Sequence, residues 1–166
     1  MALRFTSSLV RFLRSSIVEV ELTRILLVED DPRDVELIEL ALDTYNLVNH
    51  IDVVDDGEQA LNYLVGSAAC PPSHALPRVV FLDLKLPKIS GIKVLEAIRT
   101  HPRTQHLIVV VMTSSQEDRD LKACYDLGAN SYIVKPLDFT EFVDVSRQVG
   151  LYWMVLNKPP LLYESA

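Results

Sequence analysis

The stretch Val79-Val80-Phe81-Leu82-Asp83 determines the fold class that the sequence predicts. Four consecutive apolar residues rich in strand formers favour a short strand buried on both faces, which is typical of a parallel sheet. Similar short runs occur at four other places: Arg24–Val28, Ile51–Val54, Ile108–Met112 and Ser131–Val134. We therefore expect five strands in one parallel sheet.

Helical patterns separate these runs, and each begins near a residue that suits a helix N-terminus. The expected starts are Asp31-Pro32, Glu58, Ser90-Gly91, Ser114 and Asp138. Two capping boxes are expected, Ser114-x-x-Glu117 and Asp138-x-x-Glu141, with Leu137 and Phe142 as a hydrophobic staple at the second. The alternation of strands and helices predicts an α/β doubly wound fold with right-handed crossovers.

Length and composition indicate one domain and exclude several partners. The chain has 166 residues, 49% of them apolar, which suffices for one core. The net charge of −7 argues against nucleic acid as a partner, because a phosphate backbone is met by Lys and Arg. No apolar run reaches the roughly 20 residues that span a bilayer. Cys70 and Cys124 lie outside any metal or disulfide pattern and are expected to be free thiols.

The segment from Met1 to Val18 differs from the rest because it holds three arginines and no acid, with apolar residues between them. Two interpretations are open. One is an amphipathic helix for a membrane surface or for targeting, and the other is a flexible lead or a mis-set start site.

Polar residues follow four of the expected strands, where parallel sheets gather their functional groups. With the strand order 2-1-3-4-5, Asp30, Asp83, Thr113 and Lys135 would converge, with Glu29 beside them. Neighbouring carboxylates repel, and a hard cation such as Mg²⁺ relieves that repulsion. Asp83 would then serve as a nucleophile for a phosphoryl group, Lys135 would supply positive charge and Thr113 a hydroxyl donor.

Each of these residues also has an ordinary structural explanation. Acids after a strand often cap the next helix, as Asp31 is expected to do. Thr113 before two serines is a common cap, and Lys135-Pro136 is a plain strand exit. The functional interpretation depends on the joint placement of the residues on four strand ends.

Four motifs resemble the receiver domain of two-component response regulators, over Arg24 to about Gly150. They are Leu27-Val28-Glu29-Asp30-Asp31, Phe81-Leu82-Asp83-Leu84-Lys85-Leu86-Pro87 with Gly91, Met112-Thr113-Ser114, and Gly128-Ala129-Asn130-Ser131-Tyr132-Ile133-Val134-Lys135-Pro136. The resemblance implies a flavodoxin-like (βα)5 fold, a cytoplasmic protein and a histidine kinase as phosphoryl donor. It divides the chain into an N-terminal extension at 1–22, a receiver domain at 23–160 with an extended fifth helix, and a tail at 161–166.

The resemblance also assigns roles to single residues. Asp83 is the implied phospho-acceptor, and Mg²⁺ is held by Asp30, Asp83 and the backbone carbonyl of Lys85, with Glu29 in the acidic pocket. Thr113 and Lys135 hold the phosphoryl group, and Thr113 acts with Tyr132 as a switch. The Lys135-Pro136 bond is expected to be cis.

One departure from the family pattern concerns Lys85, a position that is often small and polar. Its side chain is expected to alter the lifetime of the aspartyl phosphate. More narrowly, the chain resembles stand-alone response regulators paired with phytochromes, through Val28-Glu29-Asp30-Asp31-Pro32, the loop before Val79, and the end of the fifth helix. There Phe142, Tyr152 and Trp153 are a candidate interface for a homodimer or a kinase, unless they only pack on the sheet.

Two other functions compete with the phosphorylation switch. A haloacid-dehalogenase-type phosphatase needs a second Asp, as acid and base, at the position that Lys85 occupies. Catalysis beyond the protein's own phosphorylation and dephosphorylation is therefore not expected. A pseudo-receiver would act by binding without phosphate. Its usual sign is loss of an acid, Thr or Lys from the site, and all of these are present here. A nucleotide site is disfavoured because no Gly-rich phosphate loop is present.

Overall fold

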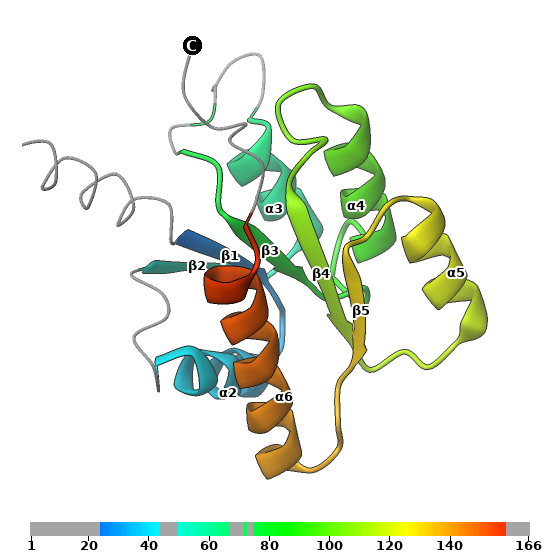
Figure 1. The fold of residues 1–166 in the computed structure, drawn as a ribbon. Coiled ribbons are helices and arrows are strands. Elements are labelled where there is room, and N and C mark those ends of the chain that lie inside the picture. Colours follow the sequence, from blue (N-terminus) through cyan, green and yellow to red (C-terminus); the bar gives the residue numbers. More distant parts are fainter. Residues whose placement is uncertain (1–23, 44–49, 67–71, 73–74, 159–166) are drawn as a thin grey trace, which may run out of the picture.

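The computed structural model describes residues 24–43, 50–66, 72 and 75–158. The expected extension at 1–22, the tail at 161–166 and Cys70 therefore lie outside the described residues. The elements in chain order are β1 (Arg24–Val28), α2 (Pro32–Asp43), β2 (His50–Val54), α3 (Gly57–Leu64), β3 (Val79–Leu82), α4 (Gly91–Thr100), β4 (Ile108–Thr113), α5 (Asp118–Asp126), β5 (Ser131–Val134), α6 (Phe139–Leu151) and η1 (Tyr152–Leu156). Figure 1 shows their arrangement.

The five strands form one parallel sheet in the order β2-β1-β3-β4-β5, as predicted. The register aligns the last residues of neighbouring strands: Val28 lies opposite both Val54 and Leu82, and Thr113 lies opposite Val134. Because all strands run the same way, the residues that follow them meet at one edge of the sheet. This register brings the polar residues after β1, β3, β4 and β5 into one neighbourhood.

Helices cover both faces of the sheet (Figure 1). Alternate residues of β1, β3 and β4 point to opposite faces, so each strand contributes to two separate cores. One core lies under α2 and α6 and includes Ile25, Leu27, Ile38, Leu42, Val79, Phe81, Val110, Met112 and Phe142. The other lies under α3, α4 and α5 and includes Leu26, Val28, Leu64, Val80, Leu82, Leu95, Ile98, Val109 and Val111. Burial on both faces explains the continuous apolar runs.

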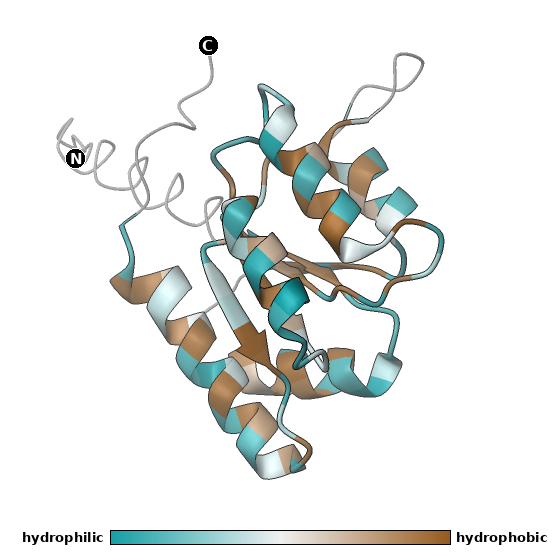
Figure 2. Cartoon of the chain, turned by 90° about the vertical axis from the view of Figure 1, so that its right-hand side faces the viewer, coloured by the Kyte–Doolittle hydropathy of each residue, from teal (hydrophilic) through white to brown (hydrophobic). Residues whose placement is uncertain are grey.

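The helices are amphipathic, as expected of elements that cover a sheet. Figure 2 shows apolar and polar residues alternating along the helices, and the buried ones recur at helical spacing, as Val94, Leu95 and Ile98 do in α4. Within the described residues, no helix is both long and apolar enough to cross a membrane.

The helix starts agree only in part with the prediction. Helix α2 begins at Pro32, and α6 follows Asp138, whose side chain accepts a hydrogen bond from the Glu141 backbone N–H at 2.9 Å. The capping box at Ser114 is wrong, because α5 begins only at Asp118. Buried Ser115 donates instead to the Asp120 carboxylate at 2.6 Å. The staple is also wrong, because the Leu137 side chain is 99% exposed.

The extension of the last helix changes its hydrogen-bond pattern. Helix α6 ends at Leu151, and a π-helical turn from Tyr152 to Leu156 follows. The Arg78 guanidinium, from the residue before β3, donates to the carbonyls of Trp153 at 3.4 Å and Asn157 at 2.9 Å. Carbonyls at a helix end lack partners within the helix, so Arg78 satisfies two of them and ties the extension to the sheet.

Replacing Ser146 by alanine is expected to stabilise the protein. In the described part of the chain, the Ser146 hydroxyl of α6 is a fully buried side-chain group without a hydrogen-bond partner. Removing an unsatisfied buried hydroxyl should raise the free energy of unfolding by about 1 kcal/mol. Urea unfolding measures the change.

The matched control is Ser115→Ala, since that buried hydroxyl has a partner in Asp120. This substitution should lower the free energy of unfolding by about 1 kcal/mol or more. A loss of stability in Ser146→Ala comparable to that of the control would show that Ser146 has a partner after all.

Candidate functional site

The carboxyl edge of the sheet forms an acidic cleft of about 550 Å³. Its polar lining includes Glu29, Asp30, Asp31, Asp34, Asp83, Lys85, Ser114 and Lys135. Backbone bonds continue the sheet into the site: Glu29 donates to the Val54 carbonyl, Asp83 to that of Val28 and Lys135 to that of Thr113. The side chains at this edge therefore stand on rigid supports.

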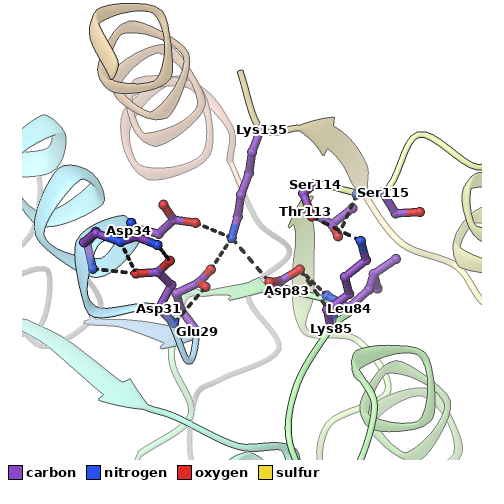
Figure 3. A network of polar contacts seen from close by, with 11 residues as sticks. Glu29, Asp31, Asp34, Asp83, Leu84, Lys85, Thr113, Ser114, Ser115 and Lys135 are labelled. Atoms are coloured by element: carbon purple, nitrogen blue, oxygen red, sulfur yellow. Dashed lines mark hydrogen bonds and ion pairs between the residues drawn. The ribbon is translucent and has the colours of Figure 1, made fainter. Parts of the chain in front are cut away.

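Lys135 occupies the centre of the site (Figure 3). Its ammonium lies 2.5 Å from the Glu29 carboxylate, 2.8 Å from that of Asp34 and 3.3 Å from that of Asp83. Burial by itself would lower the pKa of Lys135, but the charge of Asp83 and the hydrogen bonds to Asp34 and Glu29 outweigh it, so the pKa is raised. Lys135 is therefore a fixed positive charge at neutral pH.

Glu29 is a buried carboxyl with an unusual protonation equilibrium. Its side chain is 2% exposed, and burial raises its pKa to about 7, although the hydrogen bond and charge of Lys135 oppose the rise. The charge of nearby Asp83 adds to the increase. A further cation at this place would favour the ionised form.

Three carboxylates are placed to share such a cation. One oxygen each from Glu29, Asp30 and Asp83 lie within 4.8 Å of one another. Asp30 is exposed, whereas Glu29 and Asp83 are buried. The donors are all oxygens, which suits Mg²⁺ or Mn²⁺ better than the softer metals that sulfur and nitrogen ligands select. These residues fit a divalent cation.

Asp83 presents its two carboxylate oxygens differently. Oδ1 accepts hydrogen bonds from the backbone N–H groups of Leu84 at 2.6 Å and Lys85 at 3.4 Å. Among the described residues, Oδ2 accepts a single hydrogen bond, from the Lys135 ammonium at 3.3 Å. An oxygen whose lone pairs are not all engaged is the better nucleophile, so the geometry favours Oδ2 for attack.

The residues after β4 form the side of the site opposite β1. The Thr113 side chain is fully buried, and its hydroxyl accepts a bond from the Ser115 backbone N–H at 3.3 Å. Ser114, not Thr113, lines the cleft. The Ser114 hydroxyl accepts a hydrogen bond from the Lys85 ammonium at 3.4 Å. The Tyr132 hydroxyl donates to the Ser115 carbonyl at 3.0 Å. Ser115 thus links Thr113 to Tyr132.

Three findings differ from the sequence prediction. Asp34, which contacts Lys135, was not predicted, although its place in the first turn of the helix after Asp31-Pro32 was a usable signal. The Lys135-Pro136 bond is trans, since the described residues contain no cis peptide bond. Phe142, a candidate interface residue, is only 3% exposed because it packs in the core under α2 and α6.

Residues 25–147 match the model of the response regulator receiver domain. The chain belongs to this family. As a receiver domain it is a signalling protein of the two-component type, and its sheet order is that of the flavodoxin-like receiver fold.

Two curated relatives cover most of this receiver domain. The probable methanogenesis regulatory protein FilR2 of Methanothrix harundinacea is 38% identical over 82% of this chain and 86% of its own. The response regulator Rcp1 of Synechocystis is 31% identical over 78% of this chain and 88% of its own. The similarity therefore extends over nearly the whole length of both relatives.

Solved structures of response regulators superpose on this chain, and one of them is a phytochrome response regulator. The phosphorylated cyanobacterial phytochrome response regulator RcpA superposes with a TM-score of 0.77 at 31% identity, covering 83% of this chain and 98% of that one. The Mn²⁺-bound form of response regulator Rcp1 superposes with a TM-score of 0.74 at 30% identity, covering 83% and 99%. The expected relation to phytochrome response regulators is confirmed.

Proposed function

We propose that this receiver domain is a phospho-acceptor switch in which Asp83 takes a phosphoryl group from a phytochrome-type histidine kinase. The observation that carries the proposal is the position of Asp83, which has a carboxylate oxygen within 4.8 Å of oxygens of Glu29 and Asp30 and whose Oδ2 lies 3.3 Å from the Lys135 ammonium. The phosphorylated state of RcpA supports the chemistry, and the fact that RcpA is a phytochrome response regulator supports the class of kinase.

In the proposed transfer, Asp83 Oδ2 attacks phosphorus while the bond from phosphorus to the donor imidazole nitrogen breaks, and the imidazole keeps the electron pair. Asp30, Asp83 and the Lys85 backbone carbonyl would hold Mg²⁺, with Glu29 in the acidic pocket. The ion would neutralise charge on the phosphoryl oxygens. Lys135 stabilises the same charge from the other side, and it is already within 3.3 Å of Oδ2.

The proposed response to phosphorylation runs through Thr113 and Tyr132. A phosphoryl oxygen would attract the Thr113 hydroxyl, which now accepts a bond from the Ser115 N–H. If the Thr113 hydroxyl turns toward the phosphoryl group, its bond with the Ser115 N–H is lost. Ser115, whose carbonyl accepts a bond from the Tyr132 hydroxyl, could then move. Tyr132 would then change its position and reshape the surface formed by α5, β5 and α6.

Lys85 is expected to lengthen the life of the phosphorylated state. Its ammonium donates to the Ser114 hydroxyl at 3.4 Å, and both residues line the cleft, so it would shield the phosphoryl group from water and balance its charge. The substitution Lys85→Asn, which keeps the backbone carbonyl, should speed loss of phosphate by roughly threefold or more, the effect of one exposed charge. Phosphate release is measured after the donor is removed, and unchanged kinetics would exclude a role for this side chain.

The signal is proposed to pass through protein contact in the cytoplasm, including a homodimer that uses the end of the last helix. With Phe142 in the core, the supporting residues are Tyr152, Val155 and Leu156, which are at least half exposed. Trp153, packed edge-on against Tyr152, supports their placement. We expect Trp153→Ala to weaken self-association in analytical ultracentrifugation. An unchanged oligomeric state and unchanged kinase affinity would remove this role.

The proposed function is tested with acetyl phosphate, a small phosphoryl donor, and intact-mass measurement of the purified chain. We expect a gain of one phosphoryl group with Mg²⁺ and no gain when EDTA removes the ion. A second arm offers the phosphorylated kinase domain of a phytochrome, which should transfer its phosphoryl group faster than acetyl phosphate does. No gain from either donor would favour a pseudo-receiver that acts by binding alone.

A further inference from the structure

Asp34 accepts a hydrogen bond from the Lys135 ammonium, which has three N–H donors. The Lys135 side chain is 8% exposed, and its donors face Glu29, Asp34 and Asp83. A phosphoryl oxygen can gain Lys135 only by taking the place of one of these carboxylates. The present contact with Asp34, at 2.8 Å, is shorter than that with Asp83, at 3.3 Å.

Asp34 differs from the other two carboxylates in where it comes from and in what else it can bind. It stands in the first turn of α2, whereas Glu29 and Asp83 directly follow strands. It is also outside the group of acids whose oxygens lie within 4.8 Å of one another. A divalent cation among Glu29, Asp30 and Asp83 would reduce the hold of those acids on Lys135 and leave that of Asp34 nearly intact.

We propose that Asp34 is a positioning residue that draws the Lys135 ammonium toward α2 and thereby weakens its grip on the phosphoryl group of Asp83. The inference rests on the proposed function of the site. Asp34 then competes with the phosphoryl group for the same donor, which keeps the phosphorylated state from becoming too stable. A switch that must be reset benefits from such a competitor.

The test removes the charge of Asp34 and measures how tightly the site holds a phosphoryl mimic. Trifluoroberyllate becomes a tetrahedral mimic of a phosphoryl group when beryllium bonds to a carboxylate oxygen. Its affinity is measured by calorimetry at saturating Mg²⁺. Asp34→Asn should bind it roughly three- to tenfold more tightly than the native chain, the range expected for one partly buried charge contact. Asp34→Ser should act in the same direction, and Asp34→Glu should restore the native affinity.

The matched control is Asp31→Asn. Asp31 lines the same cleft and carries the same charge, but Arg33 holds its carboxylate at 2.7 Å. If the effect works through Lys135, this control should change the affinity much less than Asp34→Asn. An equal gain in both variants would show a general charge effect and overturn the proposal, as would an unchanged or weaker affinity in Asp34→Asn.

The two proposals fail in different ways. If the native chain acquires no phosphoryl group from acetyl phosphate or kinase, the proposed function itself is wrong. If the native chain is phosphorylated and binds trifluoroberyllate, but Asp34→Asn and Asp34→Ser bind it no more tightly, only the role of Asp34 is wrong.

Discussion

Asp83→Asn is expected to abolish the Mg²⁺-dependent gain of a phosphoryl group. The amide group of asparagine is a poor nucleophile. The substitution also removes one negative charge from the three carboxylates that would hold the divalent cation. The side chain keeps its size, so the hydrogen bonds of the Leu84 and Lys85 N–H groups can be preserved by the amide oxygen. Intact mass after incubation with acetyl phosphate measures the loss, which should be complete.

Asp31→Asn serves as the control for this prediction. It removes an acid from the same cleft while leaving Asp83, Asp30 and Lys135 in place. We expect it to take up a phosphoryl group as the native chain does. Phosphoryl uptake that persists in Asp83→Asn would mean that another residue is the acceptor.

Gly91→Ala is expected to damage both the fold and the site. A Cβ at position 91 would lie 2.0 Å from the Asp83 carbonyl oxygen and 2.7 Å from the Leu84 Cα, so backbone must move. Overpacking against backbone should cost about 3 kcal/mol of the free energy of unfolding. Because the displaced backbone is that of Asp83, the rate of phosphoryl uptake should fall as well. Urea unfolding and intact mass measure the two effects.

Gly128→Ala provides a comparison within the same chain. Its Cβ would approach the Arg99 side chain at 3.3 Å, and its φ of +84° makes alanine unfavourable there. The positive φ should cost about 1 kcal/mol of the free energy of unfolding. Little packing cost is added, because the neighbouring atoms belong to a flexible side chain. If Gly91→Ala were no more destabilising than Gly128→Ala, the close packing of α4 on Asp83 would not be real.

The sequence was sufficient to predict the sheet and the position of the site. The apolar runs of β1, β3 and β4 are buried on both faces, so their pattern carries strong information. Once the strand order is known, the residues directly after the strands must share one edge. Glu29, Asp30, Asp83 and Lys135 could therefore be placed together from their position in the chain alone.

Features that depend on the distance between helices and strands could not be predicted in this way. Asp34 reaches Lys135 across 101 positions of sequence, and its contact depends on how α2 packs on the sheet. Phe142 was a candidate both for an interface and for packing on the sheet, and the structure places it in the core under α2 and α6. The expected cap at Ser114 does not form: α5 begins only at Asp118, and Ser115 donates to the Asp120 carboxylate.

The central claim, that Asp83 carries the phosphoryl group, is tested most directly by trapping the modified residue. The native chain is incubated with acetyl phosphate and Mg²⁺, and borohydride then reduces an acyl phosphate to an alcohol, which marks the modified aspartate as homoserine in peptide mass spectra. We predict homoserine at position 83, and none there when EDTA is present. Homoserine at another aspartate, or none at all under conditions where the intact mass rises, would contradict the account.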